Sequence, residues 1–273
     1  MSPALPGRAQ DSDSPKELEP GVQFYETTQT TSVDSETTLW VYLPANAGDN
    51  LPCVVIAPAG TPLIYGKDLS DEDRAEEMPY VREGFAVVAY SIDGPVVEQP
   101  SDDDVLAGLT AFRKAHAGVT DTFAAIDYIR KNLPQVSPDK IYVAGHSSAG
   151  TLALLAAETD PRIKACIAYA PVCDVPRRQA KATPLLRPLV PDIATFFSHS
   201  SPLTRVAKLR CPLFLFHADD DTNVTTADIL PFVKAVRKTN THVTFMRVHK
   251  GGHNDSMMTD GIPAAIDWLK KLP

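Results

Sequence analysis

Short apolar runs alternate with stretches of helical composition along most of the chain, and this alternation is the strongest constraint on its fold. Residues 53–57 and 85–90 are continuously apolar, which is typical of strands buried on both faces of a parallel sheet. Further strands are expected near residues 141, 163, 212 and 243, with helices at about 71–83, 101–116, 120–132, 148–158, 225–239 and 262–271. The pattern predicts an α/β fold with a mostly parallel central sheet of about eight strands and helices on both faces.

The two ends of this pattern differ from its middle. Residues 22–31 and 37–43 alternate between apolar and polar side chains, which predicts antiparallel edge strands. Residues 1–20 are rich in Pro, Ser and acidic residues, and we expect a disordered leader there. Residues 21–273 are expected to form one domain, because α/β folds of this length are commonly single domains. Within it, residues 176–210 place five prolines between two sheet strands, which indicates a small lid or pocket-wall insertion.

Composition and charge exclude several classes of protein. With a net charge of −8, the chain lacks the basic face that nucleic-acid binding requires. No apolar stretch approaches the roughly 20 residues that cross a bilayer, and the N-terminus lacks the apolar core of a signal peptide. We therefore expect a soluble protein, cytoplasmic or secreted with its signal peptide absent from this chain. The four cysteines have no C-x-x-C spacing, so buried free thiols are expected rather than a zinc site, with a disulfide as the alternative.

The run IYVAGHSSAG at residues 141–150 carries the strongest functional signal. An apolar strand ends at Gly145 and a run of helix formers follows, so the serine between them is presented on a sharp turn. Such a turn needs small residues two positions before and after the serine, and Gly145 and Ala149 take those places around Ser147. Ser147 is therefore the predicted nucleophile rather than Ser148. The alternative is a serine that only caps the following helix.

A serine hydroxyl becomes a good nucleophile only beside a base that a third group orients. Downstream of the last expected strand, glycines bound a short loop that presents His253, and His253 is the predicted base. His249 in the same loop is the alternative. The other two histidines near expected strand ends, His146 and His217, are expected to pack or form hydrogen bonds beside the sheet.

The acid should follow a strand that ends at the same edge of the sheet. Three adjacent aspartates follow the run at residues 212–216, and the residue pattern alone leaves the choice open among Asp219, Asp220 and Asp221. Asp174, which follows the strand expected near residue 163, is a further alternative.

Together these stretches resemble an α/β-hydrolase of the prolyl-oligopeptidase-like group, which includes dipeptidyl-peptidase and acylaminoacyl-peptidase types. The resemblance covers about residues 37–271 and depends on residues 141–150, 201–217 and 251–253. Family members commonly follow the strand before the acid with His-Gly, two variable residues, the acid Asp, and Val three residues further on. Read onto this chain, that pattern begins at His217 and ends at Val224, and it implies Asp221 as the acid.

The resemblance also implies an oxyanion hole. One donor would be the backbone N–H of Ser148, and the other would come from the loop at residues 57–62, with Gly60 as the main candidate and Thr61 behind it. That loop reads APAGTP, where relatives often have His-Gly-Gly. The side chains of Thr61, Tyr65, Phe196 and Phe197 are candidates for binding the substrate.

The predicted activity is that of a serine esterase working through an acyl-enzyme, without a metal or an organic cofactor. Ser147 would attack, His253 would act as base, and Asp221 would orient the imidazole. Peptidases of the resembled group usually carry a large β-propeller, for which this chain has no room, so a small-molecule or polymeric ester is the expected substrate. A peptidase of the prolyl-oligopeptidase type is the first alternative, and a hydrolase-fold binding protein without catalysis is the second.

Overall fold

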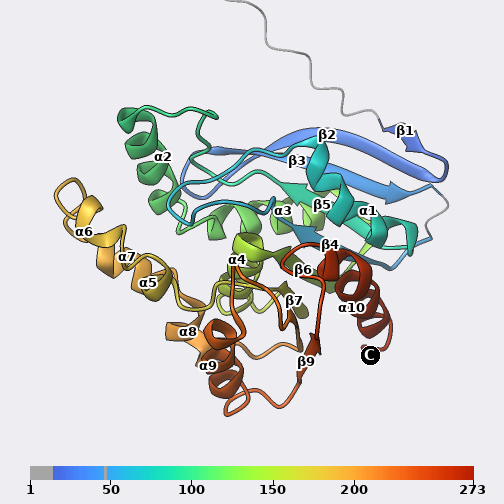
Figure 1. The fold of residues 1–273 in the computed structure, drawn as a ribbon. Coiled ribbons are helices and arrows are strands. Elements are labelled where there is room, and N and C mark those ends of the chain that lie inside the picture. The colour runs from blue at the N-terminus through green and yellow to red at the C-terminus, as the bar shows by residue number, and fades with distance from the viewer. Residues whose placement is uncertain (1–14, 46–47) are drawn as a thin grey trace, which may run out of the picture.

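A nine-stranded sheet runs through the computed structural model, which describes residues 15–45 and 48–273 (Figure 1). Its strand order is β1-β2-β3-β5-β4-β6-β7-β8-β9. The strands are β1 Lys16–Glu19, β2 Val22–Thr30, β3 Glu36–Pro44, β4 Leu51–Ile56, β5 Ala86–Tyr90, β6 Val136–His146, β7 Ala165–Tyr169, β8 Leu213–Ala218 and β9 Val243–Val248. The six strands from β5 to β9 in this order pair in parallel, whereas β1, β2 and β3 pair antiparallel to their neighbours. The expected α/β-hydrolase fold is confirmed, with one strand more than expected.

Burial explains why the sequence pattern identified these strands. Every residue of β5, β7 and β8 is buried, as expected for strands covered on both faces. Strand β2, in contrast, mixes buried and exposed positions because it lies near the edge of the sheet.

The ninth strand, β1, lies inside the stretch for which a disordered leader was expected. Its polar residues gave no sign of a strand, but the Glu17 carboxylate accepts the Gly21 N–H in the turn to β2, and Glu19 pairs through both oxygens with Arg82. The expected end of the leader at residue 20 is therefore wrong, because these pairings order the chain from Lys16 onward. Residues 1–14 of the expected leader lie outside the described residues.

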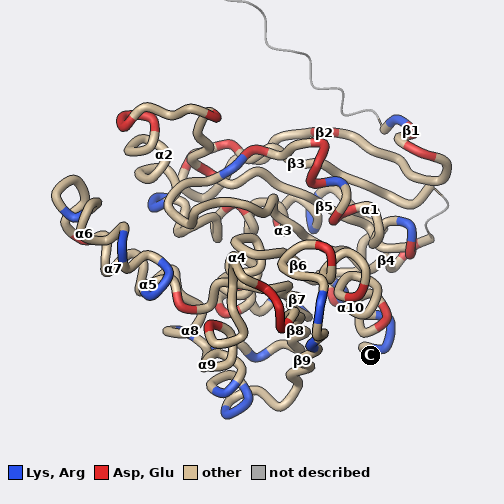
Figure 2. The backbone as a smooth tube through the Cα atoms, in the orientation of Figure 1, with Lys and Arg blue, Asp and Glu red and all other residues tan. Residues whose placement is uncertain are grey.

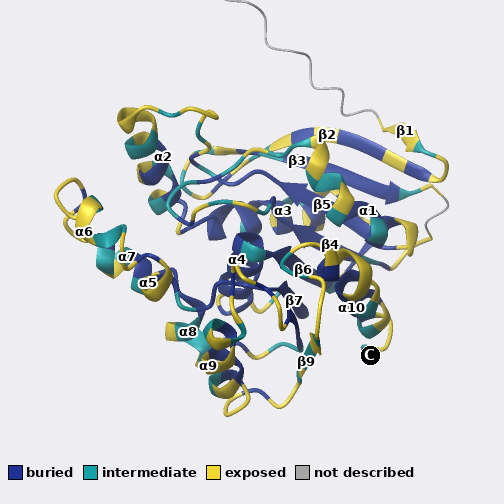
Figure 3. Cartoon of the chain, in the orientation of Figure 1, coloured by how far each residue is buried: buried dark blue, intermediate teal, exposed yellow. Residues whose placement is uncertain are grey.

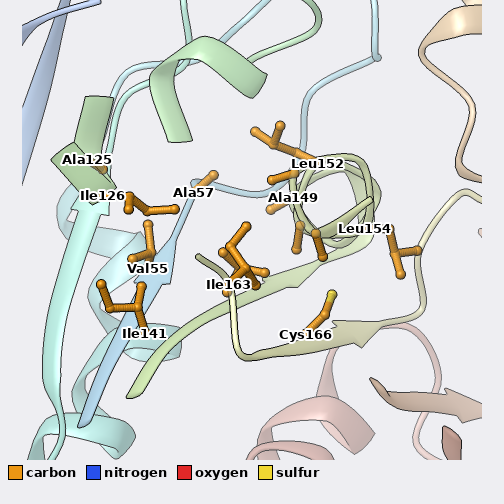
Figure 4. Packing of buried hydrophobic residues seen from close by; sticks show 14 of the residues in the cluster. Val55, Ala57, Ala125, Ile126, Ile141, Ala149, Leu152, Leu154, Ile163 and Cys166 are labelled. Carbon is orange, nitrogen blue, oxygen red and sulfur yellow. The ribbon is translucent and has the colours of Figure 1, made fainter. Parts of the chain in front are cut away.

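Helices cover both faces of the sheet. The largest core cluster packs α3, α4 and α9 on one face, and the second packs α1 and α10 on the opposite face. Figure 4 shows part of the largest cluster, which includes Val55 and Ile141 of the sheet and Ala149 and Leu152 of α4. The helices outside the insertion are η1 Asp71–Asp73, α1 Arg74–Arg82, α2 Asp102–Lys114, α3 Val119–Asn132, α4 Ser147–Ala157, α9 Thr226–Val236, the π-helical turn η3 Met257–Gly261 and α10 Ile262–Leu269.

The start of α2 illustrates how local sequence sets a helix boundary. The Ser101 hydroxyl accepts the Asp104 N–H, and the Asp104 carboxylate accepts the Ser101 N–H, which completes a capping box. Acidic residues fill the first turn and basic residues the last turn of this helix (Figure 2), so that charge complements the helix dipole. The expected start after Ser101 is confirmed.

The insertion expected at residues 176–210 folds as a chain of short helices that lies to one side of the sheet (Figure 1). These are α5 Val175–Arg178, α6 Thr183–Leu186, α7 Ile193–His199, α8 Pro202–Arg205 and η2 Val206–Lys208. Val190, Ile193 and Phe197 of the insertion pack with Leu63 and Val224 of the main body in a third apolar cluster. The tip around α6 is exposed (Figure 3). The insertion is thus attached to the body through its own small core.

Among residues 15–45 and 48–273, no helix has both the length and the apolar character that a bilayer crossing requires. All four cysteines are free thiols.

Candidate active site

Ser147 lies where β6 turns sharply into α4. Its backbone has a φ of 53°, a left-handed conformation that is uncommon and costs roughly 1–3 kcal/mol for a residue with a side chain. The turn brings Gly145 so close to Ala149 that a Cβ on Gly145 would lie 2.4 Å from the Ala149 carbonyl. A small residue is therefore required at position 145, as predicted from the sequence.

The start of α4 also supplies backbone donors. Ser147 and Ser148 lie in the first turn of the helix, where N–H groups have no acceptor inside the helix. The aligned peptide dipoles give this end of the helix a partial positive charge. The Ser148 N–H is therefore placed beside the Ser147 side chain at a point that favours a negatively charged oxygen.

His253 and Asp221 form the central polar pair of the site. The His253 Nδ1 donates to Asp221 Oδ2 at 2.7 Å, and the Asp221 side chain is 0 % exposed. The other Asp221 oxygen accepts the N–H groups of Asn223 at 2.8 Å and Val224 at 3.0 Å. Burial raises the pKa of Asp221, but the hydrogen bonds from His253 and these two amides together lower it by more than burial raises it. The pKa of Asp221 therefore lies below its ordinary value. Asp221 is thus held as a carboxylate that fixes the His253 proton on Nδ1.

The three adjacent aspartates have three different partners. Asp219 pairs with Arg247 and with His249, whose side chain is 97 % exposed. Asp220 accepts the N–H groups of Gly251 and Gly252, and so anchors the loop that carries the histidine. Only Asp221 among the three bonds the His253 ring. Asp174 instead caps α5 by accepting the Arg177 N–H at 3.1 Å.

The second nitrogen of the His253 ring makes no hydrogen bond to another described residue. Nε2 is buried, and within the described residues it has no hydrogen-bond partner, Ser147 Oγ included. With the proton on Nδ1, Nε2 carries a lone pair and can accept a proton. The His253 ring stacks at a tilt against the ring of His146, the residue next to Ser147, with 4.6 Å between centroids.

His146 links His253 to helix α1. Its Nε2 donates to the His253 carbonyl oxygen at 2.9 Å, while its Nδ1 lies 3.3 Å from a carboxylate oxygen of Glu76 in α1. His146 therefore has the hydrogen-bonding role expected for it. Glu76 could not be predicted as its partner, because 70 residues separate the two and the residues of α1 show only helical composition. His217 is buried, burial lowers its pKa, and both its ring nitrogens lack partners among the described residues.

The loop after β4 lies against the start of α4. The Thr61 N–H donates to Ser148 Oγ at 3.0 Å, so this amide is already engaged. The Gly60 N–H makes no hydrogen bond within the described residues, and Gly60 has a φ of +91° that suits glycine. Of the two loop amides considered from the sequence, Thr61 thus has a hydrogen-bond partner and Gly60 has none within the described residues, and the oxyanion role of Gly60 stays a prediction.

The structure places the four proposed substrate-binding side chains differently from one another. Thr61 and Ser148 line a small, mainly apolar pocket next to the Ser147 turn. Tyr65 is half-buried and packs against α2 at Gly108. Phe197 is 1 % exposed and belongs to the core of the insertion, and Phe196 packs edge-on against Phe112. Phe197 thus packs between the insertion and the main body, and its expected contact with a substrate stays a prediction.

The nine-stranded, mostly parallel sheet and the strand-turn-helix serine with a His-Asp pair together define a serine hydrolase of the α/β-hydrolase class. The family comparison identifies it further: residues 106–272, more than half of the chain, match the prolyl oligopeptidase family, and the chain belongs to that family.

Solved structures with the same fold include both esterases and peptidases. An acetyl xylan esterase from Paenibacillus sp. R4 superposes with a TM-score of 0.73 at 15% identity, over 95% of this chain and 88% of that one. The esterase Pf2001 from Pyrococcus furiosus gives a TM-score of 0.67 at 15% identity and 98% coverage of both chains. The Pyrococcus horikoshii acylaminoacyl peptidase gives 0.73 at 17% identity, over 94% of this chain but only 43% of its own. No curated protein matches the sequence.

Proposed function

We propose that this protein hydrolyses carboxylic esters through an acyl-enzyme on Ser147. The observation that carries the proposal is the buried Asp221–His253 hydrogen bond, which leaves the His253 Nε2 beside the Ser147 turn without a partner among the described residues. A base with one nitrogen fixed by a carboxylate and the other available is the arrangement that activates a serine hydroxyl.

In the first half of the reaction, Ser147 Oγ attacks the ester carbonyl carbon while its proton passes to His253 Nε2. The carbonyl oxygen becomes negatively charged and is bound by the N–H groups of Ser148 and Gly60. The resulting imidazolium is stabilised by Asp221. Collapse of the tetrahedral intermediate breaks the ester C–O bond, and the leaving alcohol takes the proton from His253.

In the second half, water attacks the acyl-enzyme. His253 Nε2 takes one proton from the water, the new oxygen–carbon bond forms, and the same two amides bind the oxyanion again. Collapse of this intermediate returns the proton to Ser147 Oγ and releases the carboxylic acid. Each cycle ends with His253 in its starting state, the neutral imidazole with its proton on Nδ1.

Ester hydrolysis is the first candidate, and it is supported by solved esterases that share this fold over 95% and 98% of this chain. A pocket of about 250 Å³ lies next to the acid loop, but neither Ser147 nor His253 is in its lining, which consists of Val172, Cys173, Asp174, Arg177, Arg178, Asn223, Val224 and Asp228. Peptide hydrolysis is the second candidate, because the family includes peptidases.

Labelling with a fluorophosphonate tests the nucleophile. We expect the parent protein to be labelled, Ser147→Ala to lose the label, and Ser148→Ala to keep it at a reduced rate. An unlabelled, folded parent protein would favour a binding protein without catalysis. Turnover of p-nitrophenyl acyl esters of increasing chain length, compared with that of aminoacyl anilides, tests the substrate class. Faster cleavage of the anilides would replace the esterase proposal by the peptidase one.

A further inference from the structure

Two side chains hold the two peptide units on either side of Gly60. On one side, the Lys67 Nζ donates to the Ala59 carbonyl oxygen at 3.0 Å. On the other side, the Thr61 N–H donates to Ser148 Oγ at 3.0 Å. The role of Ser148 follows from its place beside the nucleophile, but no part of the proposed mechanism accounts for Lys67.

The geometry of the peptide bond links Lys67 to the oxyanion hole. The Ala59 carbonyl and the Gly60 N–H belong to one planar peptide unit, and no cis peptide bond occurs in the described residues. In a trans peptide the C=O and N–H bonds point in opposite directions, so fixing one fixes the other. A hydrogen bond from Lys67 to the Ala59 oxygen therefore sets the direction of the Gly60 N–H. Gly60 has a positive φ and no Cβ to restrict it, so without this bond the peptide unit has little else to hold it.

Lys67 is itself fixed at both ends. Its backbone forms hydrogen bonds with Ile92 in both directions. Its Nζ pairs with one Asp73 oxygen at 3.1 Å, while the other Asp73 oxygen accepts the N–H and the hydroxyl of Ser70. The Asp73 side chain is 12 % exposed and Lys67 is 36 % exposed. A lysine held in this way can act as a rigid donor to one carbonyl.

We propose that Lys67 is a positioning residue that orients the Gly60 N–H toward the substrate oxygen, with Asp73 holding Lys67 in place. This inference depends on the proposed hydrolase function of the same site. It predicts that the loss of Lys67 weakens binding of the transition state more than binding of the substrate, because the amide bond to the oxygen strengthens as negative charge develops.

The test compares Lys67→Met with Lys67→Arg in p-nitrophenyl acetate hydrolysis. Complete loss of an oxyanion donor typically costs ~10²–10³ in kcat. Lys67→Met keeps the Gly60 N–H but removes the hydrogen bond that orients it. We therefore expect this variant to lower kcat about 10- to 100-fold, with KM changed less than about threefold. Lys67→Arg keeps a donor for the Ala59 oxygen and should recover most of the rate. A trifluoromethyl ketone, which forms a charged adduct with the serine, should lose affinity for Lys67→Met by about the same factor as kcat/KM.

Two further variants separate positioning from other effects. Lys234→Met removes an equally charged, exposed lysine on α9 and should leave all constants unchanged. Asp73→Asn keeps an oxygen for Ser70 but loses the ion pair, so it should lower kcat about 2- to 10-fold. A rise in kcat for Asp73→Asn would mean that Lys67 acts through its charge, and would overturn the proposal. So would a Lys67→Met protein with parental kcat. If the parent protein neither labels nor hydrolyses esters, the proposed function has failed, whatever Lys67 does.

Discussion

At the scale of single residues, neighbours in the sequence have separate tasks. Asp219, Asp220 and Asp221 bind β9, the glycines before the histidine, and the histidine itself. The residue pattern could not choose among them, since each is an acid at the end of the same strand. Only the resemblance to a family indicated Asp221, through the spacing from His217 to Val224.

Asp221→Asn tests this assignment. An asparagine would present an N–H group to His253 Nδ1 and favour the proton on Nε2, where the mechanism needs a lone pair. We expect kcat for p-nitrophenyl acetate to fall by about 10³- to 10⁴-fold with the fold retained, as judged by circular dichroism. Asp219→Asn, the matched change two residues away, should cost less than about tenfold. A larger loss of kcat for Asp219→Asn than for Asp221→Asn would show that Asp221 is not the acid.

At the scale of elements, α4 carries Ser147, the proposed nucleophile, at one end and an unusual carboxylate at the other. Glu158 at the C-cap is 5 % exposed, and neither of its oxygens has a partner in the described part of the chain. Burial raises the pKa of Glu158 to about 8, against the opposing effect of Arg205 and Lys208. The negative end of the helix dipole also disfavours a charge there.

This carboxylate makes stability depend on pH. Because the folded-state pKa lies above the unfolded value near 4.5, the folded protein retains a proton that the unfolded chain has lost. The contribution of Glu158 is therefore favourable at low pH and is lost as pH rises toward about 8, at up to about 1.4 kcal/mol per pH unit. We expect Glu158→Gln to gain thermal stability relative to the parent between pH 5 and pH 8, with the gain level above that.

Thermal unfolding of both proteins at several pH values measures this difference. Glu98→Gln, which neutralises an exposed carboxylate, should show no such trend. A gap between Glu158→Gln and the parent that stays constant from pH 5 to pH 8 would contradict the prediction.

Elements differed in how well the sequence revealed them. Continuous apolar runs predicted the buried strands because burial on both faces leaves no polar positions. Strand β1 was not predicted, because its order depends on cross-strand hydrogen bonds and on Arg82, which is more than 60 residues away. The Ser147 turn was predictable because its requirements are local. Lys67 and Glu76 were not, because each acts on a residue that only the folded chain brings near.

At the scale of the whole molecule, the four cysteines behave as part of the core. Cys53, Cys166 and Cys173 are buried, and burial raises the pKa of each thiol; it raises that of Cys211 to about 12. Thiolate is the reactive form, so the native protein should react slowly with a disulfide reagent such as Ellman's reagent. Four thiols should react at once in denaturant. A count below four in denaturant would indicate a disulfide.

The attachment of the insertion has a consequence for the whole molecule. Gln179 donates to the Pro62 carbonyl, two residues beyond Gly60, and the insertion packs on Val224, whose N–H binds Asp221. The insertion thus bridges the loop of Gly60, the proposed oxyanion donor, and the loop of Asp221, the proposed acid. Heating should therefore abolish turnover and near-ultraviolet ellipticity over one temperature interval, because both loops are attached to the insertion and should unfold together with it.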